Sequence, residues 1–406
     1  MDKHINILVG VDFGTTKTTA SYRVIEEDKS EIYKDLLKIG RENEQDLYYE
    51  NFLPSTVFIK DPERFELEFG KLEDEISYAD QSKLLVSIKR CLLCELENKP
   101  APIPEHECYN RKNYKNKLWC KHGNRVFDIG QYNLSPSFLY REFMEEVLRR
   151  IKIALDKSPY LIETPWKISE LKVTFPVIFY KAGPALGGYI ENKITGTINK
   201  VFEKDKLIDC SLKVVEEPTA ALLENYVDIK NMPPGYGIVI DIGGGTTDLL
   251  LYGKYGNKIR IWGKTSFPIG GDDYDAIIKE LIISKLKEAN IDIDEDYLLL
   301  NKIAKETKEK KELGTWDGKF QFEFKGVRIG PFPIDEKKLN DKFDQKSEYI
   351  VTNKIMNMFL QRELEDPRWS KRVNIVLLTG GGNNIKSLKN KLRNLFVNAI
   401  IQTVNT

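Results

Sequence analysis

Apolar and polar residues alternate along the chain in two patterns, short β-rich runs and longer runs with helical spacing. Two segments, NILVGVDFGTTKTTASYRV near the start and GIVIDIGGGTTDLLLYGKY about 230 residues later, each predict a strand, a tight glycine turn and a second strand. The spacing between them is too long for a solenoid repeat. The pattern predicts two related lobes, each contributing one acidic glycine hairpin to a shared cleft.

Runs with helical spacing alternate with further strands. Residues 135–157 (SPSFLYREFMEEVLRRIKIALDK) predict a helix that Ser135 or Ser137 caps, and ELKVTFPVIFY predicts a strand. A helix is also predicted in each of KVVEEPTAALLENY, GGDDYDAIIKELIISKLKEA and RVNIVLLTGGGNNIKSLKNKLRNLF, the first and last of which begin with a strand. Strands and helices alternate throughout, which predicts an α/β fold.

Composition narrows the class of protein. The 406 residues predict two or three domains or one large two-lobed unit, and 41% hydrophobic residues suffice for a substantial core. Lys+Arg and Asp+Glu are both 62, so net charge gives no case for nucleic acid or an anionic membrane as main partner. The start lacks a secretory signal, no apolar run reaches the ~18–20 residues of a membrane span, and five cysteines do not indicate a disulfide scaffold. We expect a soluble cytoplasmic protein.

Glycine turns carry the candidate chemistry. Three follow apolar strands and a fourth opens a helix: Gly14-Thr15-Thr16; Gly243, Gly244, Gly245 and Thr246; Gly380, Gly381 and Gly382; and Gly270-Gly271. Such turns expose backbone N–H groups that can converge on an anion. Asp12, Asp241 and Asp248 would repel phosphate unless a cation lies between them, which predicts Mg²⁺. A single aspartate could merely cap its own turn, but two matched hairpins favour a metal–nucleotide site.

These motifs resemble the ATPase domain of the 70-kDa heat-shock chaperones (DnaK-like), within the actin, sugar-kinase and chaperone superfamily. The matching segments run from about residue 9 to 395 and are VGVDFGTTKT, FLPSTVFIK, VSIKRCL, KVTFPVIFY, VVEEPTAALLENY, VIDIGGGTTDLLL, IGGDDYDAII, KEKKELG and IVLLTGGGNNIKSLKNKL. The resemblance implies an α/β, two-lobed actin-like ATPase fold with duplicated ribonuclease-H-like domains and a central nucleotide cleft. Lobe I is expected over residues 1–230, with a variable insertion at about 60–130. Lobe II is expected over 231–406, with a subdomain at about 271–335.

The resemblance also implies roles for single residues. Asp12 and Asp241 would position Mg²⁺, largely through water, while Lys89 matches the catalytic lysine beside the γ-phosphate. Glu217 would orient metal waters or the attacking water, and Asp248 is a candidate base or water-positioner. The implied nucleotide contacts are Gly14, Thr15, Thr16, Lys17, Gly243, Gly244, Gly245, Thr246 and Gly271 for the phosphates, and Gly380, Gly381, Gly382, Asn384, Lys310 and Lys311 for the adenosine. For the two adjacent lysines, a solvated charged face is an equal alternative.

The chain departs from the family pattern in several places. Lys17 stands where the family usually has tyrosine or asparagine, Glu216 where it has asparagine, and Asn384 where an arginine packs near the base. Either Glu306 or Thr307 fits the family's glutamate before the paired lysines. The sequence ends at NAIIQTVNT, and we expect no peptide-binding domain in it.

Cysteines gather in the expected insertion. Cys91, Cys94, Cys108 and Cys120 fall within about 30 residues, with His106 and His122 among them. Thiolate and imidazole at this spacing suggest a structural Zn²⁺ site. Cys91 and Cys94 also continue an apolar helical pattern, which favours buried or free thiols instead.

We therefore expect an ATPase that binds Mg-ATP or Mg-ADP, hydrolyses ATP slowly and serves as a chaperone-type switch. A pseudo-ATPase is the variant of this hypothesis. The partners expected are nucleotide and a protein (a co-chaperone, a client or another domain of a longer chain), without nucleic acid or membrane. The alternatives are an actin-like protein that forms nucleotide-dependent filaments, as in plasmid segregation, and a small-metabolite kinase. EEPTAALL and GGDDYD favour the chaperone branch.

Overall fold

The computed structural model divides into two compact units, Met1–Glu217 and Pro218–Thr406. It describes residues 5–25, 31–40, 50–72, 75–77, 80, 83–86, 88–89, 117–120, 125–128, 136–162, 165–177, 192, 195–196, 201, 208–267, 269–291, 306, 310, 319–324, 327–333, 337–338, 341–342, 369–384 and 386–404. The mixed α/β class predicted from the sequence is confirmed in both units. The lobe boundary expected after residue 230 stays a prediction.

Unit 1 is organised around a six-stranded sheet with the order β11-β10-β1-β2-β3, in which β4 also pairs with β2. Its strands are β1 (Ile5–Phe13), β2 (Lys17–Ile25), β3 (Glu31–Leu36), β4 (Phe52–Pro54), β10 (Trp166–Phe175) and β11 (Ile208–Glu216). The β1/β2 hairpin is antiparallel, whereas β10 runs parallel to both β1 and β11. The first glycine hairpin thus lies at the centre of the sheet.

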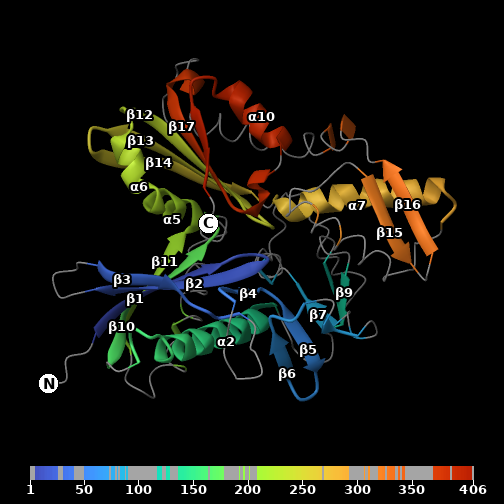
Figure 1. The fold of residues 1–406 in the computed structure, drawn as a ribbon, viewed down its shortest axis with the longest axis horizontal. Coiled ribbons are helices and arrows are strands. Elements are labelled where there is room, and N and C mark those ends of the chain that lie inside the picture. The colour runs from blue at the N-terminus through green and yellow to red at the C-terminus, as the bar shows by residue number, and fades with distance from the viewer. Residues whose placement is uncertain are drawn as a thin grey trace. The chain divides into compact units, whose positions relative to one another are not determined.

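The helix α2 (Pro136–Asp156) covers one face of this sheet (Figure 1) and corresponds to the helix predicted over residues 135–157. Its apolar side chains pack with alternate residues of β1, including Val11 and Phe13, in one buried cluster. Because successive strand residues face opposite sides, Asp12 lies on the face away from α2. Shorter strands complete unit 1: β5 (Val57–Asp61), β6 (Glu66–Phe69) and β7 (Leu84–Leu85) form one sheet, and β8 (Lys117–Cys120) pairs with β9 (Arg125–Asp128).

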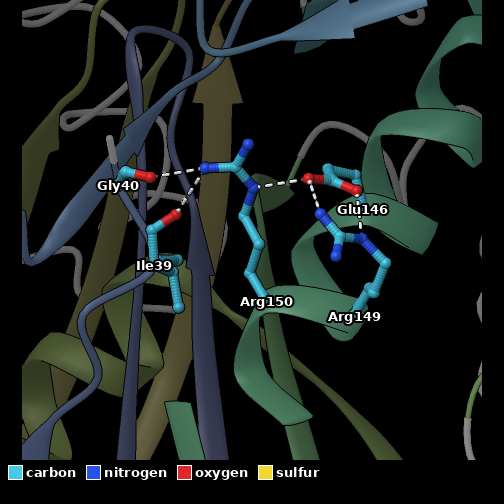
Figure 2. A network of polar contacts seen from close by, with 5 residues as sticks. All are labelled: Ile39, Gly40, Glu146, Arg149 and Arg150. Carbon is cyan, nitrogen blue, oxygen red and sulfur yellow. Dashed lines mark hydrogen bonds and ion pairs between the residues drawn. The ribbon is translucent and has the colours of Figure 1, made fainter. Parts of the chain in front are cut away.

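A buried arginine joins α2 to the segment that follows β3 (Figure 2). Arg150 donates from Nη1 to the carbonyl oxygens of Ile39, at 3.1 Å, and Gly40, and its Nε donates to Glu146 at 2.6 Å. Arg149 binds the same carboxylate with two further hydrogen bonds, of 2.7 and 2.8 Å. Burial alone would raise the pKa of Glu146, but the bond from Arg149 and the charge of Arg150 outweigh it and lower the pKa. The network needs Glu146 in its charged form.

Unit 2 contains a five-stranded sheet with the order β14-β13-β12-β17-β18. The strands are β12 (Gly235–Ile242), β13 (Thr247–Tyr255), β14 (Lys258–Phe267), β17 (Val373–Thr379) and β18 (Ile400–Thr403). Strands β12, β13 and β14 are antiparallel neighbours, while β17 runs parallel to β12 and to β18. The central five strands of unit 1 have the same order and the same directions.

Helices lie against both faces of the unit 2 sheet. One face packs with α7 (Gly271–Glu288), α10 (Lys386–Leu395) and the hairpin of β15 (Lys319–Phe324) and β16 (Val327–Pro333). The other packs with α5 (Glu217–Glu224), which begins at the last residue of unit 1, and α6 (Tyr226–Asn231). Two 3-10 turns, η4 (Trp369–Arg372) and η5 (Gly381–Asn384), flank β17. The helices predicted after Pro218, after the glycine pair at 270–271 and after the triple glycine are all present.

Candidate functional site

The glycine loop of unit 1 is held from outside by Ser55, which is fully buried. Its hydroxyl donates to the carbonyl oxygen of Gly14 at 2.9 Å, and its backbone N–H donates to the carbonyl of Thr16 at 2.8 Å. Thr18 Oγ1 lies 2.9 Å from Ser55 Oγ and donates to it, since the serine proton is already used. In a planar trans peptide the N–H points opposite to the C=O, so the N–H groups of Thr15 and Lys17 point away from Ser55.

Asp12 lies at the end of β1, between two threonines on the neighbouring strands. Thr19 on β2 and Thr174 on β10 are its direct cross-strand partners, so all three side chains share one face. Thr174 Oγ1 donates a hydrogen bond to Asp12 Oδ1, whereas Thr19 makes none to it. The carboxylate is exposed and has a second oxygen available for a ligand.

Lys89 and Glu217 form a buried ion pair in unit 1. Their side chains are 4% and 9% exposed, and Lys89 Nζ donates to Glu217 Oε1. Lys89 Nζ also lies 6.0 Å from the ring centroid of Phe13, the last residue of β1. A surface lysine on a helix, the ordinary alternative for Lys89, is therefore excluded. Two groups 128 residues apart in sequence meet beside the first hairpin.

The loop of unit 2 is held by the start of α7. Gly271 N–H donates to the carbonyl of Gly243 at 2.9 Å, and Thr247 Oγ1 donates to the carbonyl of Ile269 at 2.7 Å. A Cβ on Gly270 would lie 2.5 Å from the carbonyl oxygens of both Gly243 and Gly244, so only glycine permits this approach. The peptide N–H of Gly244 consequently points away from α7.

The first turn of α7 carries its own acid. Asp273 accepts a hydrogen bond of 2.9 Å from the backbone N–H of Gly270 and is buried. This bond satisfies one of the amides at the helix start and fixes the glycine pair against the loop. GGDDYD, noted in the sequence for its glycines, thus supplies an acid that stabilises the turn.

Four polar residues form a row across the unit 2 sheet. Register places Ser266 on β14 opposite Asp248 on β13, Asp248 opposite Asp241 on β12, and Asp241 opposite Thr379 on β17. They share the sheet face that packs with α5 and α6. Asp248 and Thr379 are each 1% exposed, and Asp241 is half-buried. Two carboxylates directly opposite each other repel unless a cation or a proton compensates them.

Several buried hydroxyls at this end of the sheet have no hydrogen-bond partner among the described residues. They are Thr246 Oγ1, Ser266 Oγ and Thr379 Oγ1. An unpaired buried hydroxyl is costly, so a partner beyond the described residues, such as water, a ligand or another part of the chain, would stabilise them.

The third glycine turn closes against Asp241. Gly380 has φ +81°, and a Cβ there would lie 2.4 Å from Ile242 O and 2.5 Å from Asp241 Oδ1. By contrast, a Cβ on Gly381 would meet no atom of the described residues within 4 Å. The structure therefore brings Asp241, Asp248 and the turns at residues 243–246, 270–271 and 380–382 together in unit 2.

Other predicted site residues are placed only in part. Lys17 is exposed, with its Nζ 4.4 Å from the ring centroid of Phe52. Lys310 is helical and half-buried, Asn384 is described in its backbone alone, and Lys311 lies outside the described residues. Their nucleotide contacts stay predictions.

The zinc hypothesis also stays open. Cys91, Cys94, Cys108, His106 and His122 lie outside the described residues, and Cys120 is described only in its backbone, on β8. Within the described part of the chain, no group of three or more His, Cys, Asp or Glu side chains is arranged to hold a metal ion.

Ser55, Thr174 and Thr379 were not identified from the sequence. Ser55 and Thr174 bind partners far away in the chain, and Thr379 lies opposite Asp241 only through strand register. A lone serine or threonine on a predicted strand carries no local signal. PST in FLPSTVFIK and the residue directly before the triple glycine are the only hints.

Comparison with known proteins agrees with the motifs. Residues 210–406 match the family model described as "Hsp70 protein". The chain is 24% identical over 411 residues to "Chaperone protein dnaK" of Phaeodactylum tricornutum (strain CCAP 1055/1), and 25% identical over 411 residues to that of Cyanidium caldarium. Each match covers 98% of this chain and 58% of the relative, so the chain spans less than two thirds of their length.

These matches confirm the predicted resemblance to an Hsp70-like ATPase domain and support a nucleotide-binding domain of the chaperone type. Among the described helices, none combines the length and the apolar character that crossing a membrane requires.

Proposed function

We propose that this Hsp70-like domain binds Mg-ATP, hydrolyses it slowly and acts as a nucleotide-controlled switch. The observation that carries the proposal is the pair Asp241–Asp248, directly opposed on adjacent strands beside three glycine turns. Opposed carboxylates attract a divalent cation, and the amides of glycine loops suit the phosphates that accompany it.

The chemistry of the proposed donors suits magnesium. Asp12 in unit 1, and Asp241 and Asp248 in unit 2, offer carboxylate oxygens, the ligand type that Mg²⁺ and its waters prefer. When bound, the ion would neutralise charge on the β- and γ-phosphates. The residues proposed to contact the phosphates are Gly14, Thr15, Thr16, Lys17, Gly243, Gly244, Gly245, Thr246 and Gly271.

Lys89 and Glu217 are proposed to serve the chemical step. The lysine ammonium would stabilise negative charge on the transferring phosphoryl group, and the carboxylate would orient the attacking water. Their buried pairing supports this assignment, because each group keeps the other charged where water is excluded. Lysine can move to phosphate only if it loosens its bond to Glu217, and the carboxylate then becomes available to water.

The equal strand order of the two sheets supports a duplicated actin-like fold. Gly380, Gly381, Gly382, Asn384, Lys310 and Lys311 are proposed to contact the adenosine. A protein partner, namely a co-chaperone, a client or another domain of a longer chain, belongs to the proposal as well.

Nucleotide binding is the direct test. We expect the purified chain to bind one ATP or ADP with a Mg²⁺-dependent Kd, measured by equilibrium dialysis with and without EDTA. Asp12→Asn and Asp241→Asn should each weaken Mg²⁺-dependent binding by about 10–100-fold, the usual cost of a lost outer ligand. Asp35→Asn is the matched control for Asp12→Asn, since Asp35 lies on β3 of the same sheet as Asp12 and accepts a hydrogen bond from Tyr33 instead.

Sedimentation and turnover separate this function from its alternatives. Slow phosphate release without pelleting supports the switch. Pelleting only with ATP and above a critical concentration would identify a filament-forming protein instead. Nucleotide binding that does not depend on Mg²⁺, or that is unchanged in both Asp12→Asn and Asp241→Asn, would refute the proposed Mg-nucleotide site.

A further inference from the structure

We propose that Thr174 and Thr379 are equivalent positioning residues, each of which holds the metal-facing aspartate of its own sheet in place. The inference rests on the proposed function for the identity of the cation. It adds two hydroxyls, of Thr174 on β10 and of Thr379 on β17, for which the motifs of the sequence imply no role.

The geometry of unit 1 shows the arrangement directly. Thr174 is the parallel cross-strand partner of Asp12, and its hydroxyl donates to Asp12 Oδ1. A carboxylate held at one oxygen presents the other in a fixed direction, which is how second-layer hydrogen bonds orient metal ligands. Thr19, on the antiparallel side of Asp12, makes no such bond.

Unit 2 repeats the placement with one difference. Thr379 is the parallel cross-strand partner of Asp241, on the strand equivalent to β10, and it is buried. Its hydroxyl has no partner among the described residues. The register puts Thr379 directly opposite Asp241 on the neighbouring strand and on the same face, so we assign this hydroxyl to Asp241. The bond forms when the carboxylate turns toward it as the cation binds.

The difference gives the two threonines opposite effects on stability without metal. Thr174 already spends its hydroxyl on a hydrogen bond, so valine, of nearly the same shape, removes an interaction. Thr379 buries a hydroxyl that is unpaired, so valine removes a desolvation cost. Both changes remove the donor that the metal-bound aspartate needs.

The experiment is a Mg²⁺ titration of ADP binding to the full chain, with thermal unfolding in EDTA measured on the same samples. Thr174→Val and Thr379→Val should each raise the Mg²⁺ concentration for half-saturation about 10-fold or more, with metal-free ADP binding unchanged. In EDTA, Thr379→Val should melt at or above the wild-type temperature, and Thr174→Val slightly below it. Thr174→Ser and Thr379→Ser restore the hydroxyl and should restore the Mg²⁺ dependence.

Thr19→Val is the matched control, because it removes a hydroxyl from the other neighbour of Asp12 without removing a bond to it. The proposal is overturned if the Mg²⁺ concentration for half-saturation rises equally for Thr19→Val and Thr174→Val. It is also overturned if that concentration does not rise for either Thr174→Val or Thr379→Val. Should a valine variant not fold, the comparison of alanine with serine at the same position replaces it. Failure of wild-type protein to bind ADP with Mg²⁺ would instead refute the proposed function, so the two failures are distinguishable.

Discussion

The two central sheets have the same strand order and directions, yet the aspartate at the end of each central strand has different neighbours. Asp12 faces two threonines, one of which donates to it. Asp241 faces Asp248 on one side and a buried threonine on the other. Unit 1 thus places a hydroxyl donor beside its carboxylate, whereas unit 2 places a second carboxylate beside it. The same strand arrangement can therefore give the acid a different chemical neighbour in each unit.

The loops themselves match more closely than their sequences suggest. Residues 14–17 lie between the paired positions Phe13 and Thr18, and residues 243–246 lie between Ile242 and Thr247, so both loops have four residues. The first carbonyl of each loop accepts a hydrogen bond from outside, from Ser55 in unit 1 and from the N–H of Gly271 in unit 2. Lys17 is the counterpart of Thr246, and Thr19 that of Asp248.

The largest effect is expected from the buried arginine of unit 1. Arg150→Met removes two bonds to carbonyls and one to Glu146, and should lower the free energy of unfolding by about 3–5 kcal/mol, as for a broken buried ion pair. Arg149→Met is the control: it binds the same carboxylate, but its side chain is 49% exposed against 10% for Arg150, so we expect below about 1 kcal/mol.

Urea unfolding measures both variants. The stabilisation by charged Glu146 is present above the ordinary glutamate pKa and is lost as the pH falls through its lowered folded-state pKa. The difference in unfolding free energy between wild type and Arg150→Met should therefore become smaller at acidic pH. Equal losses of unfolding free energy for Arg150→Met and Arg149→Met would show that burial of the side chain does not determine the size of the loss.

A second test breaks unit 2 at its third glycine turn. Gly380→Ala places a Cβ against Ile242 O and Asp241 Oδ1 in a left-handed conformation, and should cost about 2–4 kcal/mol. Gly381→Ala has open space for the same methyl group and should leave the unfolding free energy nearly unchanged. Comparable losses at both positions would mean that the turn tolerates no side chain anywhere, and the argument from close approach to Asp241 would fail.

Much of this arrangement was predictable from the sequence. Glycine turns after apolar strands predicted the hairpins and the helices that follow, with Asp12 and Asp241 near the ends of their strands, because these features depend on residues close together in the chain. The Thr-Thr pair that each hairpin sequence contains does not align in the structure, because strand register makes Thr15 and Thr16 correspond to Gly244 and Gly245. Ser55, Thr174 and Thr379 act across strands, and only the pairing of distant segments reveals them.

The smallest effect addresses the charge difference itself. Asp248→Asn makes the unit 2 row resemble that of unit 1, where an uncharged threonine faces the aspartate. In EDTA we expect the variant to be more stable than wild type by about 0.2–1 kcal/mol, because two opposed like charges no longer repel. Asp12→Asn should give no such gain, since its cross-strand neighbours are threonines and the variant loses the charge-assisted bond from Thr174.

With saturating Mg²⁺ and ADP, wild type should become more stable than Asp248→Asn, because the wild-type pair of carboxylates then gains more from the cation than the variant does. Urea unfolding of Asp248→Asn and Asp12→Asn, each in EDTA and in Mg²⁺ with ADP, gives the four free energies of unfolding to compare with wild type. If Asp248→Asn were less stable than wild type in EDTA, the buried carboxylate would be a structural acid, and the pair could no longer carry the argument for a cation.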